Sequence, residues 1–223
     1  MFLIPERSKN TPFMNNAQDL KEHWNKAYNK EDGQLGWFEE NPTPTMQLIE
    51  KCRLQKDAKI LNVGVGTTNL IDTLLDAGFN NLIANDLSDL ALQKLQDRIQ
   101  KSHKYQLKTI ADDLTNPSEL QHLKNVDLWI DRAVLHFFLK EKEQTAYFDL
   151  IKNIIAKNGY VLIAVFALDG AEKCCGLDLK RYNTDMIQEK LGDPFKLIGS
   201  FNHTFINPFG GERPYVYTLF QKK

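Results

Sequence analysis

The 223-residue chain has few cysteines and no long apolar segment. Its three cysteines, Cys52, Cys174 and Cys175, are too few and too unevenly placed for a disulfide framework, which favours a reducing compartment. No apolar run approaches the roughly 18 residues of a membrane-spanning helix. The apolar stretch at the N-terminus ends at Pro5 and is too short for a secretory signal. We therefore expect a cytoplasmic protein that does not contact a membrane.

The chain also lacks an excess of charge of either sign. It has 28 Lys and Arg residues against 29 Asp and Glu residues, a formal net charge of −1. Nucleic-acid binding requires clustered cations that neutralise phosphates, so we expect no nucleic-acid partner. Lys101, Lys104 and Lys108 are better explained as the solvated end of a helix. The adjacent Cys174-Cys175 has no further Cys or His nearby, so we expect no metal site.

No Pro-, Gly- or Ser-rich linker and no internal repeat divides the chain. Its length and its hydrophobic content of 42% fit one domain with a substantial core, at roughly 150 residues per domain. We expect residues 1–16 to be a flexible leader and residues 17–223 to form one domain. Within that domain, residues 17–56 carry an N-terminal aromatic cap and residues 57–223 form the ligand-binding core.

The most informative segment runs from Lys59 to Leu92. An apolar run with Gly64 and Gly66 is followed by a helical pattern, and a second apolar run leads to Asp86. This order of strand, glycine turn, helix, strand and acid is typical of a βαβ unit that binds an adenosine-containing ligand. Glycine lacks Cβ, so the turn backbone can approach the ligand closely. Asp86 lies at about the 20-residue distance from Gly66 that is expected of a ribose-hydroxyl acceptor.

The turn discriminates among adenosine-containing ligands. The dinucleotide fingerprint G-x-G-x-x-G has Gly or Ala at its last position, where Asn69 stands here. No Gly-Lys-Ser/Thr sequence of a P-loop occurs in the chain. A glycine pair by itself also fits an ordinary tight turn, but together with Asp86 it favours a bound adenosyl cofactor.

Strand-like and helix-like patterns alternate along the chain, which implies an α/β fold with a doubly wound, mainly parallel sheet. Two closing strands are joined by a turn without a helix, which implies an antiparallel C-terminal strand pair at one edge of a seven-stranded sheet. A helix N-cap is predicted at Thr43 and a helix C-cap at Asn158-Gly159. Strands are expected at 60–65, 82–84, 107–111, 126–130, 160–166, 195–205 and 214–221, and helices at 19–28, 43–52, 87–101, 140–157 and 183–191, with a further helix that ends near 78.

Four short motifs follow the strand pattern. They are N-V-G-V-G at Asn62–Gly66, N-D-L-S at Asn85–Ser88, A-D-D-L at Ala111–Leu114 and D-L-W-I-D-R-A at Asp127–Ala133. Together they resemble the motifs of class I S-adenosylmethionine-dependent methyltransferases, over about residues 19–223. The fourth motif and the tryptophan-bearing cap look most like the thiopurine methyltransferase-like branch of small-molecule enzymes. The resemblance implies a Rossmann-like methyltransferase fold with S-adenosylmethionine as cofactor.

Position by position, the resemblance implies a set of cofactor contacts. Gly64 and Gly66 would pass beneath the methionine part of the cofactor, and Asp86 would accept from the ribose hydroxyls. Asn62 stands where the class usually has Asp or Glu, so it offers the cofactor's ammonium an oxygen without the charge. The remaining contacts would be Leu87 against adenine, Asp113 or its neighbour Asp112 with the adenine amino group, Leu114 through its backbone N–H, and Asp131 beside the methionine moiety.

Three residues near the end of the fourth strand are candidates for catalysis, namely Asp131, Arg132 and His136. Methyl transfer from a sulfonium is an in-line displacement, for which the enzyme mainly supplies proximity and alignment. A general base is required only when the acceptor arrives protonated, and the ordinary pKa of a histidine suits His136 to that task. His136 could instead pack beneath its loop. Arg132 could bind an anionic acceptor or the cofactor's carboxylate, or form a structural ion pair.

Four aromatic residues, Trp24, Tyr28, Trp37 and Phe38, lie in an otherwise polar N-terminal stretch. Large rigid rings that exclude water favour a lid over the cofactor pocket, with Trp24 and Trp37 against the cofactor. The alternative is a helix that packs on the sheet.

We expect methyl transfer to a small-molecule acceptor with a thiol, chalcogen or other heteroatom nucleophile, catalysed by a monomer or homodimer. The cap would enclose such an acceptor, and no further domain remains to recognise a macromolecule. Cys174-Cys175 could meet a soft ligand, or be inert buried sulfur. The alternative is a protein-lysine methyltransferase, for which Glu39-Glu40 would attract a cationic side chain. A non-enzymatic adenosyl-binding module is supported by Asn62 alone.

Overall fold

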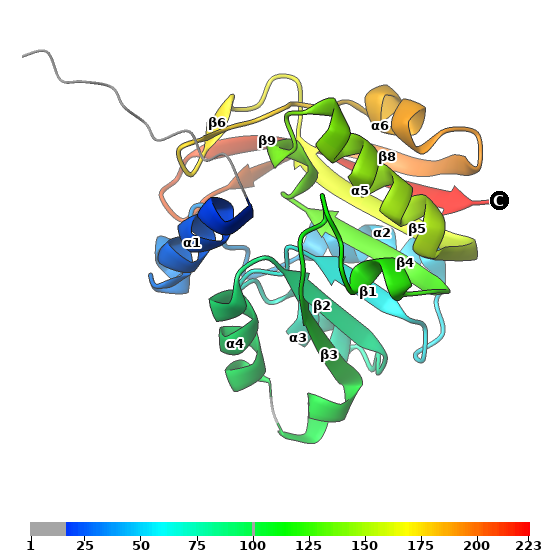
Figure 1. Ribbon diagram of the computed structural model, residues 1–223, viewed down its shortest axis with the longest axis horizontal. Coiled ribbons are helices and arrows are strands. Elements are labelled where there is room, and N and C mark those ends of the chain that lie inside the picture. Colours follow the sequence, from blue (N-terminus) through cyan, green and yellow to red (C-terminus); the bar gives the residue numbers. More distant parts are fainter. Residues whose placement is uncertain (1–16, 100) are drawn as a thin grey trace, which may run out of the picture.

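A seven-stranded sheet forms the centre of the molecule, in the order β3-β2-β1-β4-β5-β9-β8 (Figure 1). The strands from β3 to β5 are parallel, whereas β9 runs antiparallel between β5 and β8. The predicted mainly parallel sheet with an antiparallel C-terminal pair is confirmed. The computed structural model describes residues 17–99 and 101–223, and the expected leader lies outside this part of the chain. The strands are β1 (Ile60–Val63), β2 (Leu82–Asp86), β3 (Leu107–Ala111), β4 (Val126–Arg132), β5 (Ile155–Phe166), β6 (Lys173–Cys174), β7 (Leu177–Asp178), β8 (Phe195–Ile206) and β9 (Glu212–Lys222).

Helices cover both faces of the sheet. The helices α2, α3 and α4 contribute apolar residues to one core layer, and α5 and α6 contribute to the other. Because both faces are covered, a central strand such as β5 is buried without interruption from Val161 to Phe166. The helices are α1 (Ala17–Tyr28), α2 (Thr43–Cys52), α3 (Leu70–Asp76), α4 (Asp89–Arg98), α5 (Glu141–Ile154) and α6 (Thr184–Leu191), with short 3-10 helices at Asp32–Gln34, Lys101–Gln106, Leu120–His122 and Leu135–Phe137.

Two helix boundaries differ from the sequence prediction. The helix α5 ends at Ile154, and Asn158-Gly159 does not cap it, because Ile155 is already extended and pairs with β4. The strand β5 therefore starts earlier than predicted. At α2, Thr43 is the first helical residue and not the N-cap, since Pro42 occupies the cap position.

A short hairpin, β6–β7, connects β5 to α6 and escapes sequence prediction. Strands of two residues are too short to give an alternating pattern. The hairpin turns through Cys175 and Gly176, which have φ angles of +55° and +81°. It lies on the same side of the molecule as α1 (Figure 1).

The cap lies at the carboxyl ends of the parallel strands, the edge at which open α/β sheets bind ligands. The helix α1 packs on α4, and residues 29–42, which we call the strap, lead from α1 to α2. Among the described residues, no helix is both long and apolar enough to cross a bilayer.

Candidate active site

Two positions in the turn after β1 require glycine. Gly64 and Gly66 have φ angles of +55° and +53°, in the left-handed region that glycine adopts without strain. A Cβ at Gly64 would lie 2.1 Å from Cγ2 of Val134, and one at Gly66 would lie 2.8 Å from the hydroxyl oxygen of Tyr28. The loop after β4 and the cap helix α1 therefore both close on this turn.

Asp86 ends β2 directly beside the glycine turn. Its buried carboxylate accepts hydrogen bonds from the backbone N–H groups of Gly66 (2.9 Å) and Ser88 (2.8 Å). Burial raises the pKa of Asp86 to about 6, against the opposing effect of these hydrogen bonds. Ser88 caps α4, and its hydroxyl donates to the side-chain oxygen of Asn25 in α1 (2.6 Å). The acid, the turn and the cap helix are thus tied together.

Asn62 and Arg132 lie on adjacent strands and line one narrow cavity beside the turn. The amide nitrogen of Asn62 donates to the carbonyl of Ile130 (3.3 Å), while its oxygen is buried without a partner among the described residues. The Nη2 nitrogen of Arg132 is likewise buried and has no partner there. A buried polar atom without a hydrogen-bond partner lowers the stability of the fold, so such atoms usually have a partner. This acceptor and this charged donor complement the two ends of a zwitterionic amino acid.

Arg132 also joins the core to the strap. Its Nε lies 3.1 Å from Oε2 of Glu39, and its Nη1 donates to the backbone carbonyl of Trp37 (3.1 Å). The guanidinium lies over the rings of Phe205 (4.7 Å) and Tyr215 (5.4 Å). Burial raises the pKa of Glu39, and Arg132 opposes that rise. Arg132 therefore forms the ion pair that the sequence left open and still keeps one nitrogen for a ligand.

Asp131 does not line the cofactor cavity, contrary to the sequence-based expectation. Its fully buried carboxylate accepts from the backbone N–H groups of Val134 (2.9 Å) and Leu135 (3.0 Å) and from the hydroxyl of Tyr147 (2.6 Å). Successive strand residues point to opposite faces of a sheet, so Arg132 faces the strap and Asp131 faces α5. Burial raises the pKa of Asp131 to about 6. Asp131 thus shapes the loop after β4.

His136 lines neither of the two cavities beside the turn and the strap. Its ring is fully buried, and neither nitrogen has a hydrogen-bond partner among the described residues. The rings of Phe137, Phe166 and Tyr215 lie 4.5, 5.0 and 6.5 Å away. Burial, with the nearby charge of Arg132, lowers the pKa of His136 to about 3. A neutral imidazole that binds protons so weakly packs beneath its loop, which is the other interpretation of the sequence.

The two acids after β3 have different partners. Asp112 accepts from the backbone N–H groups of residues 118–120 through both carboxylate oxygens (2.8 to 3.0 Å) and so holds the following loop. Asp113 bonds to the next turn through Oδ1 only, among the described residues. Leu87, which follows Asp86, is half-buried, and Leu114, which follows Asp113, is buried. Of the two acids considered for adenine, Asp113 is the one with a free oxygen.

Aromatic rings of the cap fill the space over the turn. The ring centroids of Trp24, Tyr28 and Trp37 lie 5.7 to 6.4 Å apart, and Trp24 also meets Phe137 at 5.1 Å. Trp37 lines the narrow cavity, whereas Trp24 supports Trp37 from behind and does not line it. The cavity measures about 20 Å³, which is room for one water molecule. An adenosyl ligand therefore fits only when the cap moves outward.

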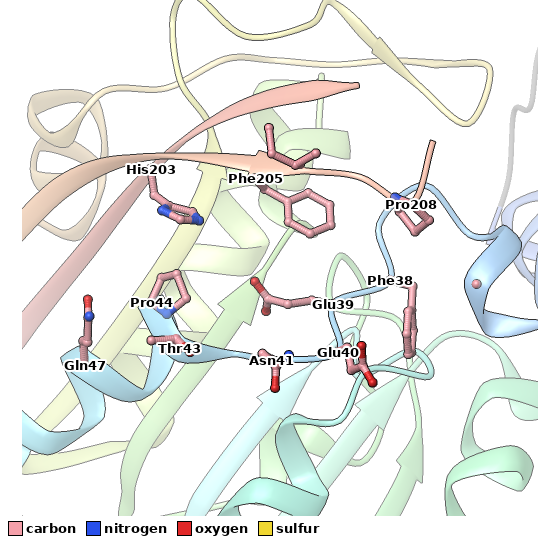
Figure 2. A pocket seen from close by; sticks show the side chains of 12 residues that line it. Phe38, Glu39, Glu40, Asn41, Thr43, Pro44, Gln47, His203, Phe205 and Pro208 are labelled. Carbon is pink, nitrogen blue, oxygen red and sulfur yellow. The ribbon is translucent and has the colours of Figure 1, made fainter. Parts of the chain in front are cut away.

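A larger cavity of about 560 Å³ adjoins the narrow one at Glu39, which lines both. Figure 2 shows His203 and Phe205 of β8 on one side, Thr43 and Pro44 of α2 on the other, and the Glu39 carboxylate between them. The sequence analysis missed the two β8 residues. Their i, i+2 spacing predicts a shared strand face, but only the sheet order brings that face to the strap.

Cys174 and Cys175 lie at the tip of the β6–β7 hairpin, with their sulfur atoms 3.4 Å apart. Both are half-buried rather than fully buried. The hydrogen bond with Cys175 and the charge of Arg213 lower the pKa of Cys174. In the part of the chain that the structure describes, no group of three or more His, Cys, Asp or Glu residues could hold a metal ion.

Comparison with solved structures supports the fold. A S-adenosylmethionine-dependent methyltransferase from Anabaena variabilis superposes with a TM-score of 0.73 at 13% identity, covering 95% of this chain and 97% of that chain. The 1,6-didemethyltoxoflavin-N1-methyltransferase of Burkholderia thailandensis, solved with S-adenosylhomocysteine, gives a TM-score of 0.69 at 18% identity, covering 92% of this chain and 87% of that chain.

Sequence comparison supports the activity. A family model described as a methyltransferase domain matches residues 61–163. The EEF1A lysine methyltransferase 2 of Danio rerio is 25% identical over 170 residues, which cover 70% of this chain and 72% of that protein. The matches to the Mus musculus and Homo sapiens proteins of the same name span only about half of those proteins, 47% and 54%. A methyltransferase domain therefore spans residues 61–163, and the chain has the fold of S-adenosylmethionine-dependent methyltransferases.

Proposed function

We propose that this methyltransferase transfers the methyl group of S-adenosylmethionine to a heteroatom of a small-molecule acceptor. The 560 Å³ cavity that adjoins the cofactor cavity at Glu39 carries the proposal. Its volume lies within the range of roughly 300 to 1,000 Å³ that is typical of small-molecule sites. The strap, α2 and β8 line this cavity together.

The unpartnered polar atoms of the narrow cavity fit the amino-acid end of the cofactor. The buried oxygen of Asn62 would accept from the ammonium, and Nη2 of Arg132 would donate to the carboxylate. Asp86 would accept from the ribose hydroxyls, and the free oxygen of Asp113 would accept from the adenine amino group. The bound cofactor supplies a methyl group on a sulfonium. The protein contributes alignment, because the displacement needs the acceptor in line with that methyl group.

The strap would close the site. Arg132 holds the strap at Glu39 and at the carbonyl of Trp37, and the same side chain keeps Nη2 for the cofactor's carboxylate. Cofactor binding would therefore give Arg132 its missing hydrogen-bond partner, and Arg132 is the residue that fixes the strap over the acceptor. Closure excludes water from the transferring methyl group and sets the distance between donor and acceptor.

A protein-lysine methyltransferase is the second candidate. The relatives named EEF1A lysine methyltransferase 2 favour it, and so do the acids Glu39 and Glu40 at the larger cavity. The test is an incubation of the enzyme with methyl-labelled S-adenosylmethionine and an extract of the source cells, followed by separation by mass. Label in the low-mass fraction supports a small acceptor. Label confined to protein contradicts it and favours lysine.

A further inference from the structure

The charged, aromatic and histidine side chains that line the larger cavity indicate which class of acceptor it binds. It is lined by three chain segments that the fold brings together: the strap, the first turns of α2 and the end of β8 (Figure 2). The inference below rests on the proposed function, since it assigns this cavity to the acceptor. The lining residues are Gly33, Phe38, Glu39, Glu40, Asn41, Thr43, Pro44, Gln47, His203, Phe205, Ile206 and Pro208.

The cavity carries negative charge that is not fully neutralised. Two of its lining residues are acids, Glu39 and Glu40, and none of the twelve is Lys or Arg. Glu39 is buried and is balanced by Arg132 at 3.1 Å. Glu40 is exposed at the opening, with no salt bridge among those found in the described residues. One carboxylate therefore remains to attract a cation.

Aromatic rings add a second feature that suits a cation. Phe205 lies under the guanidinium of Arg132, 4.7 Å from its ring centroid, so a cation already occupies one face of this ring. Phe38 stands at the far end of the cavity beside Glu40 (Figure 2). Ring faces attract ammonium groups.

His203 gives the cavity a group that can take up a proton. It is half-buried on β8, and its ring meets Tyr217 at 5.9 Å. Burial and then the charge of Arg132 lower the pKa of His203. Unlike the fully buried ring of His136, the half-buried imidazole of His203 lines the cavity, where it can take a proton from a bound ligand and pass it to water.

We propose that this cavity binds the acceptor as an amine, held by Glu40 and the Phe38 ring, and that His203 takes its proton. The ammonium gives one proton to the imidazole and becomes a neutral amine. The nitrogen lone pair then forms a bond to the methyl carbon, and the carbon–sulfur bond breaks with its electron pair going to sulfur. The products are a methylated ammonium and a neutral thioether, and His203 returns its proton to water.

Chemical blocking of the acceptor tests the nitrogen assignment. The source-cell extract is divided, and one part is acetylated to block amines while the other is treated with N-ethylmaleimide to block thiols. Each part, freed of reagent, receives enzyme and methyl-labelled S-adenosylmethionine. Loss of the labelled product after acetylation, with the product retained after maleimide treatment, supports the proposal. Product that persists after acetylation overturns it.

This design separates the failure of the inference from failure of the proposed function. Label that enters protein instead of small molecules contradicts the small acceptor, and acetylation of the extract proteins then still tests the amine. Label that enters small molecules but survives acetylation leaves the small acceptor standing and removes the amine.

Variants with matched controls test the residues, with dilutions of the unblocked low-mass fraction as acceptor. Glu40→Gln is expected to raise the apparent KM for that fraction about fivefold, with kcat kept, as expected for one exposed charge. His203→Asn is expected to lower kcat about a hundredfold, with KM kept. Glu119→Gln and His122→Ala change the same groups at exposed positions outside the cavity and should match the unchanged enzyme. Normal kinetics of both cavity variants would overturn the assignment.

Discussion

The ionisation of Asp86 links the cofactor site to pH. Burial raises its pKa to about 6, so at pH 5 only about a tenth of the molecules carry the ionised carboxylate. An ionised acceptor binds ribose hydroxyls more strongly than a protonated one. The affinity for S-adenosylmethionine should therefore rise by up to about tenfold between pH 5 and pH 7.5. Calorimetry at both pH values measures it.

Asp86→Asn provides the control, since it keeps the shape and abolishes the ionisation. Its affinity should be lower at pH 7.5 and should vary little with pH, and a wild-type affinity independent of pH would contradict the assignment. Folding responds in the opposite sense. A raised pKa in the folded state means that the contribution of Asp86 to the free energy of unfolding is complete below its ordinary pKa of 3.8 and is lost as the pH rises through about 6.

The amide of Asn62 serves the fold as well as the ligand. Its nitrogen donates to the carbonyl of Ile130 (3.3 Å), and a carboxylate at this position could not donate. Asn62→Asp should therefore lower the free energy of unfolding by about 1–3 kcal/mol without cofactor. Saturating S-adenosylmethionine should reduce this deficit, because the new carboxylate pairs with the ammonium. Urea unfolding with and without cofactor measures both, and exposed Asn80→Asp is the control. A deficit that cofactor leaves unchanged would show that Asn62 does not face the ammonium.

At the scale of elements, we expect the last two residues of β4 to have separate roles: Asp131 stabilises the fold, and Arg132 binds the cofactor. Asp131 accepts three hydrogen bonds on the α5 side, and Arg132 faces the strap. Asp131→Asn keeps one acceptor oxygen but replaces the other, with its charge, by an NH2 group. This change should lower the free energy of unfolding by about 1.5–3 kcal/mol. Its affinity for S-adenosylmethionine should change little. Arg132→Lys should instead lower the affinity for S-adenosylmethionine and change the stability little, because a lysine cannot reach three partners at once. Equal losses of affinity in both variants would contradict this division.

The strap is the element that we expect to move during turnover. Trp37 is only half-buried, and the narrow cavity beneath it must widen before a cofactor fits. Backbone amides of residues 29–42 should exchange quickly with solvent and become protected when S-adenosylhomocysteine binds. Trp37→Ala should lower turnover more than stability, whereas a core tryptophan would cost about 3–5 kcal/mol. Equal exchange in both states, with a large drop in Tm for the variant, would make Trp37 part of the core.

Across the whole molecule, the sequence predicted what depends on local pattern. Apolar runs of three to seven residues located the parallel strands, and the glycine turn with Asp86 located the cofactor edge. The roles of Asp131 and Arg132 could not be assigned, because adjacent strand residues face opposite sides and the sequence does not say which side is open. The burial of His136 could not be predicted either, because it comes from Phe166 and Tyr215, which lie far away in the chain.

The acceptor cavity is the clearest example of this limit. Glu40 and His203 are brought together because β9 pairs antiparallel with β5 and β8 then closes the sheet beside α2. A helical or alternating pattern records only neighbours within one element. Such a cavity is therefore visible only once the strand order is known.

The connection between the two cavities predicts the order in which substrates bind. The strap forms one wall of the acceptor cavity through Phe38, Glu39 and Glu40, and Arg132 fixes that wall while facing the cofactor cavity. The acceptor cavity should thus be complete only after the cofactor has bound. Initial-rate kinetics should show S-adenosylhomocysteine competitive with S-adenosylmethionine and noncompetitive with the acceptor. In Arg132→Lys, the strap is no longer coupled to the cofactor, so binding order should become random. Binding of the acceptor to the unchanged enzyme in the absence of cofactor would mean that the two cavities fill independently.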